Sequence, residues 1–112
     1  MFFSRAKANN NYRKVSFAEG HRLLQENKDL LLLDVREEEE YITGHAIGAA
    51  LFTLADINPA TAAETIPSKS TPVMVYCRSG RRSKAAAEKL LAYGYETVYD
   101  LGGLIGWPYG LE

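Results

Sequence analysis

Short apolar runs alternate with helix-like segments along most of the chain. Residues 30–35 and 73–76 are almost continuously apolar, which is typical of strands that are covered on both faces. Shorter runs at residues 49–52 and 97–100 predict two further strands. None of these runs approaches the roughly 18 apolar residues that a membrane-spanning helix needs.

Helical patterns fill the intervals in the first half of the chain. Ser16-Phe-Ala-Glu19 has the spacing of a capping box and predicts a helix over residues 17–27. The acidic start of residues 37–42 suits a second, short helix, because early carboxylates complement the helix dipole. We expect Gly44 to end that helix in the left-handed conformation.

Two more helical segments follow in the second half. Residues 54–66 predict a helical connection that Asn58-Pro59 interrupts. Residues 83–93, rich in alanine, leucine and lysine, predict a longer helix with one apolar face. The Gly102-Gly103 pair predicts a turn that leads into a short last helix or turn over residues 105–107.

The alternation of strands and helices predicts an α/β fold, with a mostly parallel sheet and helices on both of its faces. Such sheets bind ligands at the carboxyl ends of their strands. Cys77 falls at such an end, and we expect three segments to converge there: Asp34-Val-Arg36, the loop of residues 77–83, and Gly44-His45.

Length and composition indicate one globular domain. The chain has 112 residues, 46% of them hydrophobic and 24% charged, and its formal net charge is −1, so nothing indicates nucleic acid or a membrane surface as a partner. We expect a loose lead-in over residues 1–11 and a single domain over residues 12–110. We interpret the closing Leu111-Glu112 as the remnant of a vector and expect it to have no structural role. With one cysteine and no signal-peptide pattern at the start, the cytoplasm is the expected compartment.

The single cysteine opens the most informative segment, Cys77-Arg-Ser-Gly-Arg-Arg-Ser83. The pattern predicts a strand, then a cationic loop and then a helix, so that backbone N–H groups, a helix N-terminus and three guanidinium groups would surround one sulfur. Each of these favours a thiolate. Arginines at a helix start oppose its dipole unless an anion offsets them, and this local conflict indicates a site.

Each candidate residue also has a structural interpretation. Without its loop, Cys77 would be read as a small buried hydrophobe. Arg36 could simply pair with Asp34 or with the glutamates that follow, and His45 lies in a turn where it need not act as a base. Residues 37–40 are most simply a solvated helix start, so the sequence implies no metal and no cofactor.

Several short motifs, in this order, together resemble the single-domain rhodaneses, which are thiosulfate sulfurtransferases. The resemblance covers residues 15–107 and rests on Asp34-Val-Arg36, Glu40-Tyr41, Gly44-His45, Gly48-Ala49, Tyr76-Cys77-Arg-Ser-Gly80, Arg82-Ser83, Leu101-Gly-Gly103 and Trp107. One departure is Ala46, where the family more often has a larger aliphatic residue, a change that touches packing more than chemistry.

The resemblance implies a rhodanese-like fold with a five-stranded sheet, and a Cys77 nucleophile that carries sulfur as a persulfide. The donor would be thiosulfate or a persulfide, including one on a partner protein, and the acceptor cyanide, a thiol or another protein. The implied donor-binding residues are Arg78, Ser79, Gly80, Arg81, Arg82 and Ser83. Asp34, Arg36 and His45 would contact these donor-binding residues and hold them in position.

Loop length separates sulfur transfer from phosphatase chemistry on this fold. The phosphatases that resemble rhodaneses have an arginine six positions after the cysteine, whereas here that position is Ser83 and the arginine, Arg82, comes one position earlier. We therefore favour a sulfurtransferase over a phosphatase. A sulfur-relay carrier or a redox-sensing module with little thiosulfate activity remains an alternative, because the same cysteine serves each.

Overall fold

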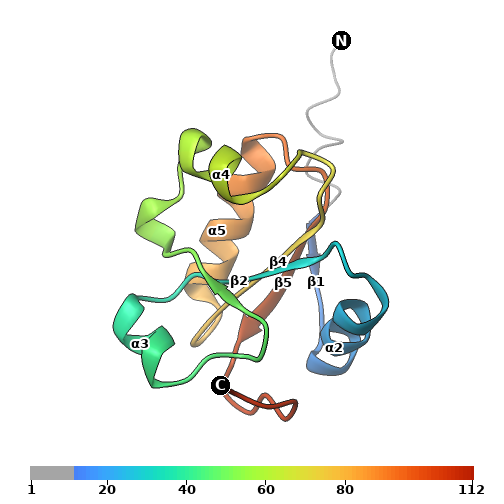
Figure 1. The fold of residues 1–112 in the computed structure, drawn as a ribbon, viewed down its shortest axis with the longest axis vertical. Coiled ribbons are helices and arrows are strands. Elements are labelled where there is room, and N and C mark those ends of the chain that lie inside the picture. The colour runs from blue at the N-terminus through green and yellow to red at the C-terminus, as the bar shows by residue number, and fades with distance from the viewer. Residues whose placement is uncertain (1–11) are drawn as a thin grey trace.

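A five-stranded parallel sheet forms the centre of the molecule (Figure 1). The computed structural model describes residues 12–112. The strands are β1 (Tyr12–Lys14), β2 (Leu31–Asp34), β3 (Ala50–Leu51), β4 (Val73–Cys77) and β5 (Val98–Gly103). The helices are α2 (Phe17–Glu26), α3 (Glu38–Thr43), α4 (Pro59–Thr65) and α5 (Arg81–Ala92), with a 3₁₀ turn η1 (Leu54–Asp56).

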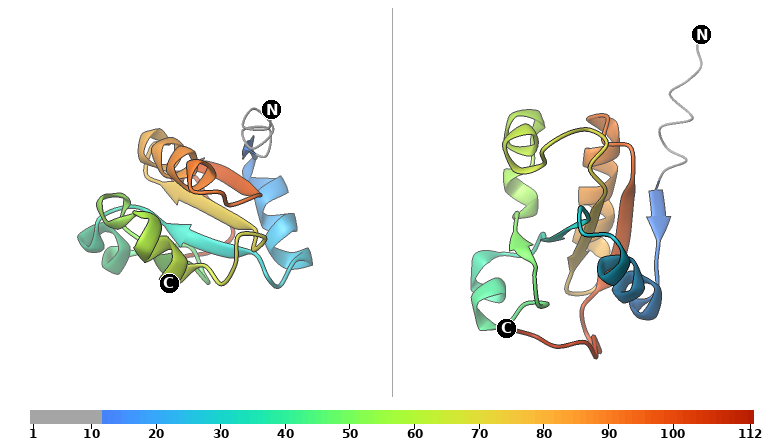
Figure 2. Two further views of the ribbon diagram at one scale, coloured as in Figure 1. Left: turned by 90° about the horizontal axis from the view of Figure 1, so that it is seen from above. Right: turned by 45° about the vertical axis from the view of Figure 1, so that its right-hand side comes forward.

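The strand order is β1-β5-β4-β2-β3, and every neighbouring pair in the sheet runs parallel. Helices lie on both faces, with α2 on one side and α4 and α5 on the other (Figure 2). The predicted α/β class, the parallel sheet and its double covering are thereby confirmed. In the described part of the chain, no helix has the length and apolar character needed to cross a bilayer.

Two separate apolar cores result from the alternation of side chains along the central strands. Leu33 and Val75 point into the core beneath α4 and α5, together with Cys77. Their neighbours Leu32 and Met74 point into the other core, beneath α2 and the C-terminal segment. Because both faces are covered, β2 and β4 have to be apolar at nearly every position, which is why their sequences stand out.

The helix starts follow their local signals. The Ser16 hydroxyl accepts the backbone N–H of Glu19 at 3.1 Å, which caps α2 as expected. Asn58 caps α4 through two backbone N–H groups and forms a capping box with Thr61. Pro59 occupies the first turn of α4, where it has no intrahelical N–H bond to lose.

Several boundaries differ from the sequence expectations. Gly44 ends α3 with φ 153° and ψ 129°, which is not the predicted left-handed helical conformation. α5 begins at Arg81, two residues early, because Gly80 takes φ 105° and serves as its N-cap. β5 extends through Gly103, where a turn was predicted, and the turn that follows at residues 105–106 is one of the two predicted alternatives for that segment.

The expectation that Leu111-Glu112 has no structural role is wrong. Leu111 forms an antiparallel bridge with Ala46. The backbone of Glu112 exchanges hydrogen bonds of 3.1 and 2.8 Å with that of His45, and its carboxylate accepts the N–H of Gly48 at 3.0 Å. The last two residues therefore close the turn that follows α3.

The end of β5 supports the loop that follows β4. The pairing of these strands shifts register between Val75 and Tyr76, so that Cys77 lies opposite Gly103. A Cβ atom on Gly103 would overlap the carbonyl oxygen of Arg78 and lie 2.8 Å from the Cα atom of Ser79. The absence of a side chain at this position lets the cysteine loop pack directly on β5.

We predict that Gly103→Ala destabilises the fold by about 1–3 kcal/mol, because the added methyl group meets loop backbone that cannot rotate away. Urea unfolding followed by circular dichroism measures the change. Ile105→Ala, at a position 71% exposed, is the matched control and should stay within about 0.5 kcal/mol of wild type. Equal midpoints for Gly103→Ala and wild type would contradict this view of the loop.

Candidate active site

Backbone N–H groups converge on the sulfur of Cys77. This residue ends β4, and the chain then turns through residues 78–80 into α5. The Sγ atom accepts the N–H of Gly80 at 3.0 Å and that of Ser83 at 3.3 Å. Gly80 can aim its N–H inward because its φ of 105° is readily adopted only by glycine.

The pKa of the Cys77 thiol lies below its ordinary value, although burial by itself raises it. The N–H and hydroxyl of Ser83 act in the opposite direction, together with the N–H groups of Gly80 and Ser79. In the structure the Ser83 hydroxyl donates to the Gly80 carbonyl oxygen at 3.1 Å. The hydroxyl also lies close enough to the sulfur to stabilise the thiolate when it donates there instead. Backbone and hydroxyl donors are therefore the largest contributions that favour the ionised sulfur, and the charge of Arg82 adds to them.

Cys77 itself has no exposed surface. A cleft of about 310 Å³ lies next to the loop that follows Cys77, with Arg36, Glu40 and Arg78 among its lining residues. Leu104 also lines the cleft, and its N–H donates to the carbonyl oxygen of Cys77 at 2.9 Å. The cleft therefore lies next to the backbone of Cys77, whereas the Sγ atom itself is covered.

Arg82 is bound by a carboxylate of this chain. Its two terminal nitrogens donate to Glu40 at 2.7 and 3.0 Å, while the N–H of Glu37 donates to the same carboxylate at 2.9 Å. The hydrogen bonds from Arg82 hold the pKa of Glu40 at about 2. The pKa of Arg82 is raised, first by Glu40 and to a lesser extent by the charge of Cys77, so the ion pair lies within electrostatic reach of the sulfur.

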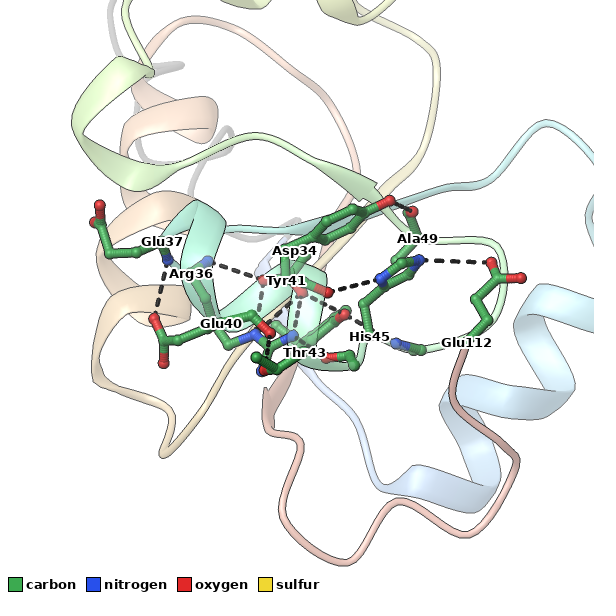
Figure 3. A network of polar contacts seen from close by, with 12 residues as sticks. Asp34, Arg36, Glu37, Glu40, Tyr41, Thr43, His45, Ala49 and Glu112 are labelled. Carbon is green, nitrogen blue, oxygen red and sulfur yellow. Dashed lines mark hydrogen bonds and ion pairs between the residues drawn. The ribbon is translucent and has the colours of Figure 1, made fainter.

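A buried polar network lies at the end of β2 (Figure 3). Asp34 accepts the Nε and Nη2 groups of Arg36, the latter at 2.6 Å, and the hydroxyl of Tyr76 at 2.6 Å. Arg36 also donates to the Gly44 carbonyl oxygen at 2.7 Å, and Tyr76 accepts the N–H of Ala46 at 3.1 Å. Asp34 raises the pKa of Arg36, while burial and then the bond to Asp34 raise that of Tyr76. The network ties β2, β4 and the turn after α3 together.

His45 is occupied away from the cysteine loop. Its ring stacks on Tyr41 at 3.7 Å between centroids, and its Nδ1 donates to the Tyr41 carbonyl oxygen at 2.9 Å (Figure 3). Its Nε2 lies 3.7 Å from the carboxylate of Glu112. The structure places His45 as a support of the turn after α3.

The other two arginines of the cysteine loop lie on the surface. Arg78 and Arg81 are exposed, and neither side chain makes a hydrogen bond or ion pair with another residue of the described chain. Of these two, Arg78 lines the cleft beside Cys77. Over residues 12–112, no three His, Cys, Asp or Glu side chains are grouped so that they could hold a metal ion.

Sequence reasoning missed two parts of this site. Glu40 was expected to be simply solvated, yet it binds Arg82 of helix α5. Tyr76 was assigned only to a strand, although it lies directly opposite Asp34 in the sheet register. The available signal for the contact between Tyr76 and Asp34 was the presence of one polar residue on each of two adjacent buried strands.

Comparisons with known proteins agree with this geometry. Residues 16–108 match the rhodanese-like domain family. A rhodanese from E. coli, solved with anions, is 34% identical with a TM-score of 0.68, over 74% of this chain and 96% of that chain. A rhodanese-like domain from Anabaena sp. is 26% identical with a TM-score of 0.78, over 88% of this chain and 77% of that chain.

A human single-domain sulfurtransferase shares the fold, with a TM-score of 0.66 at 23% identity over 80% of this chain and 88% of that chain. The chain therefore belongs to the rhodanese-like domain family. Membership of this family supports a function of the sulfurtransferase type.

We predict that the Cys77 thiol titrates below about 8.5, the value of an unperturbed thiol. Ser83→Ala should raise this pKa, because it removes the hydroxyl and keeps the N–H donor. The ultraviolet absorbance of the thiolate, followed against pH, measures both values. Ser79→Ala is the control, since Ser79 acts on the sulfur through its backbone only. A Ser83→Ala titration that coincides with wild type would refute the role of the hydroxyl.

Proposed function

We propose that this protein is a sulfurtransferase that carries a sulfane sulfur as a persulfide on Cys77. The observation that supports this most directly is the convergence of the Gly80 and Ser83 N–H groups on Sγ, at 3.0 and 3.3 Å. These donors favour a thiolate without a neighbouring base, and a thiolate is the species that attacks a sulfane sulfur.

In the first half-reaction, the Cys77 thiolate attacks the outer sulfur of thiosulfate. The new bond joins the two sulfurs, the S–S bond of thiosulfate breaks, and its electron pair leaves with sulfite. Sulfite leaves as a stable anion, so this step needs no general acid. The ring of His45 is stacked on Tyr41, and the proposed step does not require it to act as a general acid.

In the second half-reaction, a nucleophile such as cyanide attacks the outer sulfur of the persulfide. Thiocyanate leaves, and the electron pair of the broken S–S bond returns to the Cys77 thiolate. No outside oxidant or reductant is needed. A thiol acceptor, free or on a partner protein, would take the sulfur in the same way, and a reducing compartment such as the cytoplasm suits this chemistry.

The loop residues would hold the anionic donor through their N–H groups and through Arg78. The loop turns into the N-terminus of α5, where backbone N–H groups have no helical partners and favour anions. Arg78 is exposed at the cleft and brings a positive charge to its entrance. Ser79 lies in this loop and Arg81 directly follows it. Asp34 and Arg36 support the loop through the buried network.

A sulfur-relay carrier is the second candidate, and the burial of Cys77 favours it. A sulfur without exposed surface needs an event that uncovers it, and docking of a partner protein could supply one. Such a carrier would accept sulfur from a protein persulfide and react slowly with thiosulfate. Parallel assays with thiosulfate and with a persulfide-generating cysteine desulfurase distinguish the two.

We predict that incubation with thiosulfate adds about 32 Da, one sulfur atom, to the intact protein. Mass spectrometry of the whole chain measures the addition, and cyanide should remove it with release of thiocyanate. Cys77→Ser is the control and should gain nothing. Loading by the desulfurase without loading by thiosulfate would select the relay carrier, and no loading by either donor would rule out sulfur transfer through Cys77.

A further inference from the structure

The cleft beside Cys77 holds less positive charge than its arginines suggest. Arg36 is paired with Asp34, and Arg82 is paired with Glu40. Arg78 is the cleft arginine that has no carboxylate partner within residues 12–112. Arg81 is also unpaired among the described residues but does not line the cleft, so Arg78 is the arginine at the cleft that can meet an incoming donor.

Glu40 places a negative charge at the cleft next to the cysteine loop. Its side chain is 28% exposed and lines the same cleft as Arg78 and Arg36. The bidentate pairing with Arg82 and the N–H bond from Glu37 fix its position. With its pKa held at about 2, Glu40 is ionised at any pH at which the thiolate can be tested.

Charge separates two kinds of sulfane sulfur donor that react by the same chemistry. Thiosulfate is a dianion, whereas an organic thiosulfonate or persulfide has a single negative charge at its sulfur group. A carboxylate near the binding position repels the dianion about twice as strongly, since the Coulomb energy is proportional to the product of the charges. Arg82, already bound to Glu40, offers the dianion less attraction than an unpaired arginine would.

We propose that Glu40 is a specificity-determining residue, which holds Arg82 in an ion pair and so favours singly charged sulfane donors over dianionic thiosulfate. This inference rests on the proposed sulfurtransferase function and adds the charge class of the donor. Its chemistry is unchanged: with a thiosulfonate, the Cys77 thiolate takes the outer sulfur and the electron pair of the broken S–S bond leaves with a sulfinate.

The test compares thiosulfate with methanethiosulfonate, in which a methyl group replaces one charged oxygen. In Glu40→Gln the amide oxygen can still accept from Arg82, but the negative charge is gone. We expect the ratio of kcat/KM for thiosulfate to that for methanethiosulfonate to rise about three- to tenfold, mostly through KM for thiosulfate. Any change in thiolate reactivity affects both donors and cancels in this ratio.

The glutamate run of α3 supplies a matched control. Glu39→Gln removes the same charge from the same helix at an exposed position with no ion pair to another described residue, and should leave the ratio within about twofold of wild type. Glu40→Asp keeps the charge and should retain the wild-type ratio. In the Arg82→Gln background, Glu40→Gln should lose the part of its gain that comes from releasing Arg82 and keep the part that comes from direct repulsion.

Two results would overturn the proposal: the ratio could stay unchanged in Glu40→Gln, or it could rise equally in Glu39→Gln. An unchanged ratio with both donors slowed to the same extent would mean that Glu40 only positions Arg82. Failure of the proposed function looks different, because wild-type protein would then gain no sulfur from either donor. If Glu40→Gln does not fold, a wild-type preference for thiosulfate, with kcat/KM above that for methanethiosulfonate, overturns the proposal as well.

Discussion

The hydrogen bonds from backbone N–H groups to the buried sulfur of Cys77 are the contacts on which the site depends. Taking a charge out of water costs several kcal/mol even after relaxation, and a hydrogen bond to a charged group returns about 1.5–3 kcal/mol. Two N–H donors and a nearby hydroxyl are therefore enough to reverse the effect of burial, which matches the lowered pKa of the thiol.

This donor arrangement is a property of the backbone, so it depends on elements far apart in the sequence. β4 must run as far as Cys77, Gly80 must take φ 105°, and Gly103 of β5 must have no side chain where the loop crosses it. The Asp34 network then joins the ends of β2 and β4 through the Tyr76 hydroxyl. Removing one partner would leave a buried charge or N–H group without a bond, which costs more than the bond itself is worth.

The sequence predicted the features whose signal lies within one short segment, and it did not predict those that depend on how segments pair. The central strands and the cysteine loop were predicted because apolar runs and the order of residues 77–83 are read without knowledge of packing. β1 has no such signal: Tyr12-Arg13-Lys14 is polar and lies at the edge of the sheet, where only β5 pairs with it. The register that places Tyr76 opposite Asp34 could not be predicted either, because it depends on how β2 and β4 pair and not on either strand alone.

The three arginines of the loop show why the count of charges in a motif differs from the charge that a site presents. The sequence shows cations at a helix start, a conflict with the helix dipole that was taken as a sign of an external anion. Glu40 resolves that conflict from within the chain for Arg82, and Arg81 points to solvent, which leaves Arg78 at the cleft. The cysteine-loop motif can therefore be intact while the charge that it presents is set by a residue outside the loop. Here that residue lies on α3, about forty positions before Arg82, where only the folded chain brings the two together.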